Sequence, residues 1–194
     1  MRKEIIQLGK LRYYVLDDHA LVMPVLKDDK KKIEHIEIPS SIKYNKQIIP
    51  VTVIGASAFR ECKALKTVVL PDSIEEIRHN AFTNCFSLER IIIPPKVREI
   101  KYGTFYNCIN LRSALLHDNI CNIEMSAFYN CKSLESITIP DNIQLIHRDA
   151  FYSCTGLKNV VLHVSHFMRY DKAYLFSQIV KAGLIADNPM FHGS

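Results

Sequence analysis

The sequence has no tryptophan and only 6 glycines among 194 residues, and these shortages limit the chemistry that it can carry. Phosphate-binding loops are rich in glycine, and neither G-x-G-x-x-G nor G-x-x-x-x-G-K-[ST] occurs. The metal and hydrolase motifs H-E-x-x-H, G-x-S-x-G and C-x-x-C are missing as well. We therefore expect no catalytic site, no cofactor and no metal site, and we predict that the chain is not an enzyme.

Charge and hydropathy argue against two further classes of partner. The net charge is +5, but the densest basic run, at residues 30–32, directly follows two aspartates. No basic stripe of the kind that binds nucleic acid is visible. No run approaches the roughly 20 apolar residues of a membrane helix, and residues 1–14 lack the apolar stretch of a signal peptide. We expect no nucleic-acid partner and no membrane insertion. The chain as given is expected in the cytoplasm, or at the cell surface if it is part of a longer secreted protein.

A repeat of 23 residues fills most of the chain. Several columns recur in register, most visibly the phenylalanines Phe59, Phe82, Phe105, Phe128 and Phe151 and the cysteines Cys62, Cys85, Cys108, Cys131 and Cys154. A unit of this length cannot bury its own apolar face, so stacked units must bury a continuous ladder of like residues. We predict five units over residues 54–168. Their strands, at 66–70, 89–93, 112–116, 135–139 and 158–162, should form one parallel sheet, and each A-F-x-x-C segment should form a short helical turn opposite it.

Both ends of the array are predicted to carry caps. Apolar runs at 11–16 and 21–26 flank Asp17-Asp18-His19, which is typical of a β-hairpin. With one degenerate repeat and a turn at residues 44–47, this hairpin would make an N-terminal β cap over residues 1–53. Residues 171–182 have helical spacing of apolar side chains, which predicts a C-terminal capping helix within 169–194.

The pattern I-G-x-x-A-F-x-x-C-x-x-L-x-x-V-x-L-P-x-S-I at residues 54–74 resembles the BspA-like class of leucine-rich repeats. The resemblance extends over residues 33–166. It implies a leucine-rich-repeat solenoid with a parallel β-sheet on one face. Together with the two caps predicted above, the fold class is α/β, with an N-terminal β-hairpin cap and a C-terminal capping helix. Members of that family are surface proteins of bacteria and some protozoa that attach to host or matrix proteins, so the resemblance also implies adhesion.

The repeated cysteines do not suit a metal site. Zinc needs ligands that converge on a tetrahedral point, whereas a ladder places one thiol per unit in a straight row. We expect the five ladder cysteines to be buried, reduced hydrophobes, with disulfides between neighbouring units as the alternative. Cys121 lies outside the ladder and is predicted to be the most accessible thiol.

Other polar rows have both a structural and a functional interpretation, and we favour the structural one for each. Asn84, Asn107 and Asn130 would bond to turn backbone or form a polar binding row. Tyr106, Tyr129 and Tyr152 would pack against one another or offer a contact surface. The pairs His163/His166 and Asp118/Asp141 are candidate cation ligands, but they are also ordinary residues of a fading repeat and of a solvated turn.

The strongest candidate site lies on the outward face of the predicted sheet. Alternate strand residues point outward, which gives the column Val69, Ile92, Leu115, Thr138 and Val161. Beside this column lie polar and mixed-charge columns that include Arg90 and Arg112. Preference of β-branched residues for strands explains one or two of the apolar residues, but four in one exposed line indicate an interaction site. We predict a non-catalytic protein-binding module of unknown partner, monomeric or weakly homodimeric, with a structural spacer as the alternative.

Overall fold

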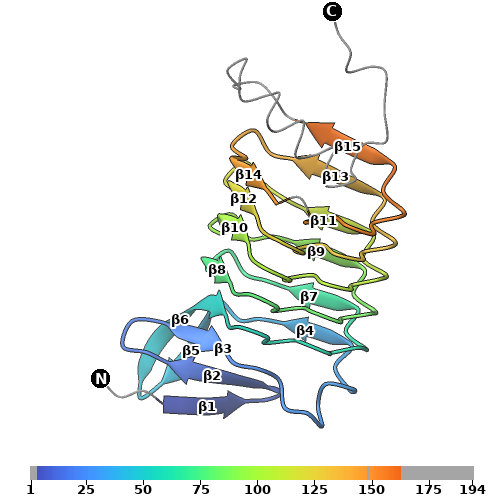
Figure 1. Ribbon diagram of the computed structural model, residues 1–194. Helices are drawn as coiled ribbons and strands as arrows, with labels where there is room; N and C mark the ends of the chain where they lie inside the picture. Colours follow the sequence, from blue (N-terminus) through green and yellow to red (C-terminus); the bar gives the residue numbers. More distant parts are fainter. Residues whose placement is uncertain (1–3, 148, 163–194) are drawn as a thin grey trace, which may run out of the picture.

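The computed structural model describes residues 4–147 and 149–162, and in this part every regular element is a β-strand. The chain winds into a stack of coils, with the N-terminal strands at one end (Figure 1). The solenoid and the parallel pairing along its main face are as predicted. The helical component of the predicted α/β class is not found in these ranges, and the predicted C-terminal capping helix lies outside them.

One strand from each coil contributes to the main parallel face. These strands are β4 (His35–Glu37), β7 (Thr67–Val69), β9 (Arg90–Ile92), β11 (Ser113–Leu115), β13 (Ser136–Ile139) and β15 (Asn159–Leu162). They lie one above the next in chain order (Figure 1). The last four pair in parallel as one sheet, which confirms the predicted register of 23 residues. β7 pairs with β4, and the amide of Glu89 donates to the carbonyl of Lys66 at 3.1 Å, which joins β7 to β9.

A second column of short parallel strands, which the sequence pattern did not predict, runs along another side of the stack. It starts at the end of β6 (Gln47–Ile54) and continues through β8 (Glu76–Ile77), β10 (Glu99–Ile100), β12 (Asn122–Ile123) and β14 (Leu145–Ile146). The isoleucine that ends each strand is buried, because it faces the centre of the coil.

The A-F-x-x-C segments are not helical, so that prediction is wrong. The amide of Phe59 donates to Ala81 of the next coil at 2.7 Å, whereas the amide of Cys62 donates back to Phe59 at 3.0 Å. Two residues four positions apart, Ser57 and Glu61, have positive φ values of 56° and 65°. The left-handed residues turn alternate amides toward the neighbouring coil, so this side also has a ladder of hydrogen bonds between coils instead of helical bonds within one segment.

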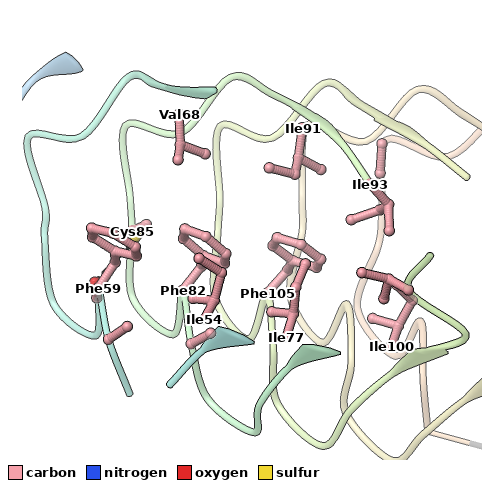
Figure 2. Close-up of a cluster of buried hydrophobic side chains, with 14 of the residues drawn as sticks. Ile54, Phe59, Val68, Ile77, Phe82, Cys85, Ile91, Ile93, Ile100 and Phe105 are labelled. Atoms are coloured by element: carbon pink, nitrogen blue, oxygen red, sulfur yellow. Dashed lines mark hydrogen bonds between the residues drawn. The ribbon is translucent and has the colours of Figure 1, made fainter. Parts of the chain in front are cut away.

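The core is a set of columns that run along the stack. Phenylalanine rings stack on one another with centroid separations of 5.2, 5.5, 5.2 and 5.1 Å from Phe59 to Phe151. Figure 2 shows Phe59, Phe82 and Phe105 lying between residues of the main face and the isoleucines of the second column. Strands of a sheet are about 4.8 Å apart, so the rings are spaced along the stack at nearly the separation of the strands.

Five strands form the cap at the N-terminal end. They are β1 (Glu4–Leu8), β2 (Leu11–Val15), β3 (Ala20–Val22), β5 (Ser41–Tyr44) and β6, in the order β1-β2-β3-β6-β5.

The predicted hairpin of the cap is confirmed, since β2 and β3 pair antiparallel. The predicted turn after β5 is also confirmed, with positive φ at Asn45 and Lys46. β1 was not predicted. β3 pairs in parallel with β6, so the cap extends the second column, and it buries Tyr13 against the first coil. The open end of the array is covered in this way, as a repeat stack requires.

Candidate functional site

The predicted outward residues do lie in one exposed line. We call the surface formed by the outward side chains of β4, β7, β9, β11, β13 and β15 the outward sheet face. Its apolar stripe consists of Val69, Ile92, Leu115, Thr138 and Val161. The exposed fractions of Val69, Ile92, Leu115 and Val161 are 56%, 67%, 59% and 46%, and Thr138 is half-buried.

Strand alternation explains why the stripe is exposed. Ile91 and Ala114 lie one residue before Ile92 and Leu115 and are buried in the core. The register places Ile92 directly beside Leu115 and Thr138 beside Val161. Side chains on adjacent strands are thus held side by side as a continuous apolar surface.

Charged side chains line the edge of this face where the strands begin. We call them the charge row, and they are Glu34, Lys66, Glu89, Arg112, Glu135 and Lys158. All six are exposed, and Lys66 forms an ion pair with Glu34 with an Nζ–Oε2 distance of 2.7 Å. The hydrogen bond to Lys66 lowers the pKa of Glu34, and the same bond raises the pKa of Lys66. The remaining outward column includes Arg90, which is exposed and lies beside Ser113.

The 23-residue spacing alone gives the five members from Lys66 to Lys158, but it does not give Glu34. The spacing from Glu34 to Lys66 is 32 residues instead of 23, because an insertion separates the first coil from the array. Glu34 could have been found from the strand His35–Glu37 that follows it. Ile36 of this strand pairs with Val68, and this register places Glu34 next to Lys66.

The six cysteines are free thiols, and the ladder is part of the core. Cys62, Cys85, Cys108 and Cys131 are buried, as predicted. Cys154, in the last described coil, is only half-buried, so the prediction of burial is wrong for this member. The thiol of Cys108 donates to the carbonyl of Phe82 at 3.2 Å, and Cys85, Cys131 and Cys154 make the equivalent bond. Burial raises the pKa of Cys62 to about 11 and that of Cys108 to about 12. These thiols are protonated at neutral pH, which makes them poor nucleophiles and poor metal ligands.

The asparagine and tyrosine rows are ladders between coils. Asn107 donates its side-chain amide to the side-chain oxygen of Asn84 at 2.9 Å, and Asn130 donates to Asn107. All three have positive φ, which Asn tolerates better than most residues. The bonds run between side chains rather than to turn backbone, which corrects the predicted partner. The tyrosine rings stack at 4.7 Å between Tyr106 and Tyr129, and Tyr152 is 56% exposed.

The other candidate ligands do not build a site in the described part of the chain. Cys121 is half-buried, with its sulfur 3.4 Å from the carbonyl of Arg98. Asp118 is exposed and Asp141 is half-buried, and His163 and His166 lie outside the described residues. No group of three or more His, Cys, Asp or Glu residues in the described ranges is arranged to hold a metal ion. No helix in those ranges has the length and apolar character that crossing a membrane requires.

One surface hollow is lined by charged side chains, and most of them are paired. The hollow near Cys121 has a volume of about 380 Å³ and is lined by Lys96, Glu75, Lys101 and Glu99, among others. Lys96 pairs with Glu75 at 2.8 Å, and Lys101 pairs with Glu99. An active site needs titratable groups that converge on a reacting atom. Pairs that satisfy each other along the surface do not meet this requirement, so the outward sheet face is the better candidate.

Comparisons with known proteins agree on the repeat class. The family model of the BspA type leucine rich repeat region matches residues 28–158 in 6 copies. No curated protein is a significant match to the chain.

Three solved structures are similar. A leucine-rich repeat protein from Bacteroides ovatus is 29% identical, with a TM-score of 0.74 over 81% of this chain and 41% of its own. A leucine rich cell surface protein from Faecalibacterium prausnitzii is 28% identical, with a TM-score of 0.70 over 84% of this chain and 43% of its own. The chain thus spans about two fifths of the length of these two proteins. A leucine-rich repeat protein from T. pallidum, 21% identical, has a TM-score of 0.68 over 90% of this chain and 96% of its own, which supports the fold alone.

Proposed function

The chain belongs to the BspA-type leucine-rich-repeat family, and from that premise we propose that it is a non-catalytic protein-binding module that uses the outward sheet face. The observation that carries this proposal is the exposed apolar stripe of Val69, Ile92, Leu115, Thr138 and Val161. Scattered surface apolar residues are normal, whereas a contiguous apolar patch with a polar rim is characteristic of interaction sites.

The stripe has the layout of a small interface. Ile92 and Leu115 lie at its centre, next to each other on β9 and β11. Central apolar side chains that lose all their water on binding usually contribute most of the affinity. Arg90 and Arg112 lie at its margin and are exposed. Charges at the rim of an interface mainly set the association rate and its salt dependence.

A cell-surface role in adhesion or host interaction is the finer form of this proposal. It is supported by the similarity to the cell surface protein of Faecalibacterium prausnitzii. In this view the strands β1, β2, β3, β5 and β6 cap the array and the coils from β4 to β15 present the binding face, while the predicted C-terminal cap at 169–194 lies outside the described residues. The chain spans about two fifths of that relative, so the comparison concerns the repeat module alone.

A double variant tests the proposal. Ile92→Asp with Leu115→Asp should abolish capture of the partner in a pull-down and leave the fold intact, because both side chains point away from the core. Ile48→Asp is the matched control, since Ile48 is 75% exposed but lies on the cap strand β6. It should retain the partner. If the double variant stays folded and still captures the partner, the outward face is not the binding site.

The alternative is a structural spacer in a longer surface protein. Its support is the same partial coverage of the two similar structures, which leaves room for binding elsewhere. A spacer predicts that the wild-type module captures no partner and that the double variant behaves like the wild type.

A further inference from the structure

The charges along the edge of the outward face alternate in sign from coil to coil. Read from β4 to β15, the charge row is Glu34, Lys66, Glu89, Arg112, Glu135 and Lys158, one residue per coil. The register of the strands places each of the last four next to its neighbours in the row. The row therefore reads minus, plus, minus, plus, minus, plus over six successive strands.

The signs of this row are opposite to the signs of the same row taken in reverse order. Two such rows therefore attract each other when they run in opposite directions. When a second copy is turned about a two-fold axis that runs parallel to the strands between β9 and β11, each column faces the same column with the coil order reversed. Glu89 then faces Arg112 of the second copy, Lys66 faces Glu135, and Glu34 faces Lys158. Every facing pair has opposite charge, and by symmetry each pair occurs twice. Resting on the protein-binding role proposed above, we infer that the partner of the outward sheet face is a second copy of this chain, packed face to face and antiparallel.

The other columns fit the same arrangement. In the apolar stripe Ile92 faces Leu115 of the second copy, and Val69 faces Thr138, so the two most exposed apolar side chains of this face bury each other at the centre. In the column between them Arg90 faces Ser113, and no like charges meet. Glu37 faces Val161 at the rim, which is the one pair in this column that places a charge opposite an apolar side chain. The match thus involves three columns of side chains and not the charge row alone.

Other ways of placing two copies lose this match. A two-fold axis along the stack puts each coil opposite the same coil and reverses the columns, so the charge row faces a different column. A shift by one coil in the antiparallel arrangement puts like charges opposite each other. A shift by two coils restores the charge match but leaves two strands of each copy uncovered. The arrangement centred between β9 and β11 is the one that uses all six strands.

Ion pairs between neighbouring coils of one chain explain little of the alternation in charge sign. Exposed ion pairs such as Lys66–Glu34 stabilise a protein by about 0–1 kcal/mol, and they leave the apolar stripe exposed. Six strands about 4.8 Å apart and five residues at about 3.3 Å each give a flat footprint of roughly 500 Å². A stable complex usually buries about 800 Å² of accessible surface on each partner. The accessible surface of a face with protruding side chains is larger than its flat footprint, so the buried surface approaches about 800 Å² without exceeding it. This predicts a weak dimer.

Opposite charge reversals on separate chains test this geometry. Lys66→Glu places two like-charged pairs in its own dimer, and so does Glu135→Lys. A mixture of the two variants restores both pairs, because Glu at position 66 of one chain faces Lys at position 135 of the other. These positions are three coils apart within one chain, so a direct contact inside the chain does not explain rescue. Lys132→Glu is the control, since Lys132 is exposed in the same coil as Glu135 but outside the outward face.

Sedimentation velocity at low salt is the measurement, with the concentration raised to about 100 μM, the range suited to a weak complex. Wild type and Lys132→Glu should sediment at up to twice the 22.3 kDa of one chain. Each reversal alone should stay at the mass of one chain, and the equimolar mixture should return to the dimer mass. A monomeric wild type, dimers of either single variant, or a mixture without rescue would each overturn the inference.

The outcome separates this inference from the function on which it rests. If the wild type is monomeric but Ile92→Asp with Leu115→Asp abolishes capture of another protein, the second-copy inference fails and the binding face stands. If dimers form equally well with that double variant, the outward face is not used for self-association either.

Discussion

Replacing Phe105 by alanine tests the stacked core most severely. Its ring is fully buried in the middle of the array, between Phe82 at 5.5 Å and Phe128 at 5.2 Å. Phe→Ala changes in cores cost about 3–5 kcal/mol, depending on how far the site can collapse. Collapse is limited here, because hydrogen bonds to the coils on both sides fix the backbone of this segment. We therefore expect the upper part of that range.

Urea unfolding followed by circular dichroism gives the free energy directly, with Tyr106→Ala as the control. Tyr106 is the next residue, is only half-buried and stacks on one ring, Tyr129, so its loss should cost about 1–2 kcal/mol. Domains of this kind are commonly stable by about 5–15 kcal/mol, so a loss of about 5 kcal/mol should remove between about a third and all of the stability of the array. Equal losses for the two variants would refute the assignment of inward and outward faces.

Three further predictions concern the thiols and the turns. A thiol reagent should label Cys121 and Cys154 in the native protein far faster than the four buried ladder cysteines, and rapid labelling of all six would contradict a buried ladder. Because burial raises the pKa of Cys62 to about 11 and of Cys108 to about 12, while unfolded thiols ionise near about pH 8.5, the unfolded chain loses protons that the folded chain retains. The free energy of unfolding should be highest below that pH and fall as the pH rises toward 11. Urea titrations in reductant should show a shallower fall for Cys108→Ala. A free energy of unfolding that does not change with pH would contradict the raised pKa values of the buried thiols. Gly103→Ala should lower the free energy of unfolding by about 1–3 kcal/mol, since a Cβ there lies 2.3 Å from Oδ1 of Asn80. A melting temperature equal to that of the wild type would show that the turn can shift to accept the added methyl group.

Periodicity alone predicted the order of the coils, but it did not resolve how each coil turns. The five buried phenylalanines and the register of β9, β11, β13 and β15 follow directly from the 23-residue spacing. The helical turn was wrong because Ala58, Phe59 and Cys62 have the same spacing in a helix and in consecutive turns. Residues that accept positive φ, such as Asn80 and Asn84, were the available signal against a helix.

The candidate site was predictable to the extent that strand alternation determines it. The exposure of Val69, Ile92 and Leu115 follows from period-two alternation once the strands are placed. The charge row was only partly predictable, because the insertion before the array shifts Glu34 out of the 23-residue register. The two-residue strands of the second column were also missed, because two residues are too few to show alternation.

Carbene footprinting of exposed side chains, with and without the bound protein, tests the central claim most directly. The bound protein is the second copy at high concentration, or the captured partner if the chain remains a monomer. If the outward sheet face is the binding surface, labelling should fall at Ile92 and Leu115 and stay unchanged at Ile48 on the cap and at Tyr152 on the turn side. All four are more than half exposed in the free chain, so each reports with similar sensitivity. Protection at Ile48 or Tyr152, with Ile92 and Leu115 labelled as before, would contradict the account.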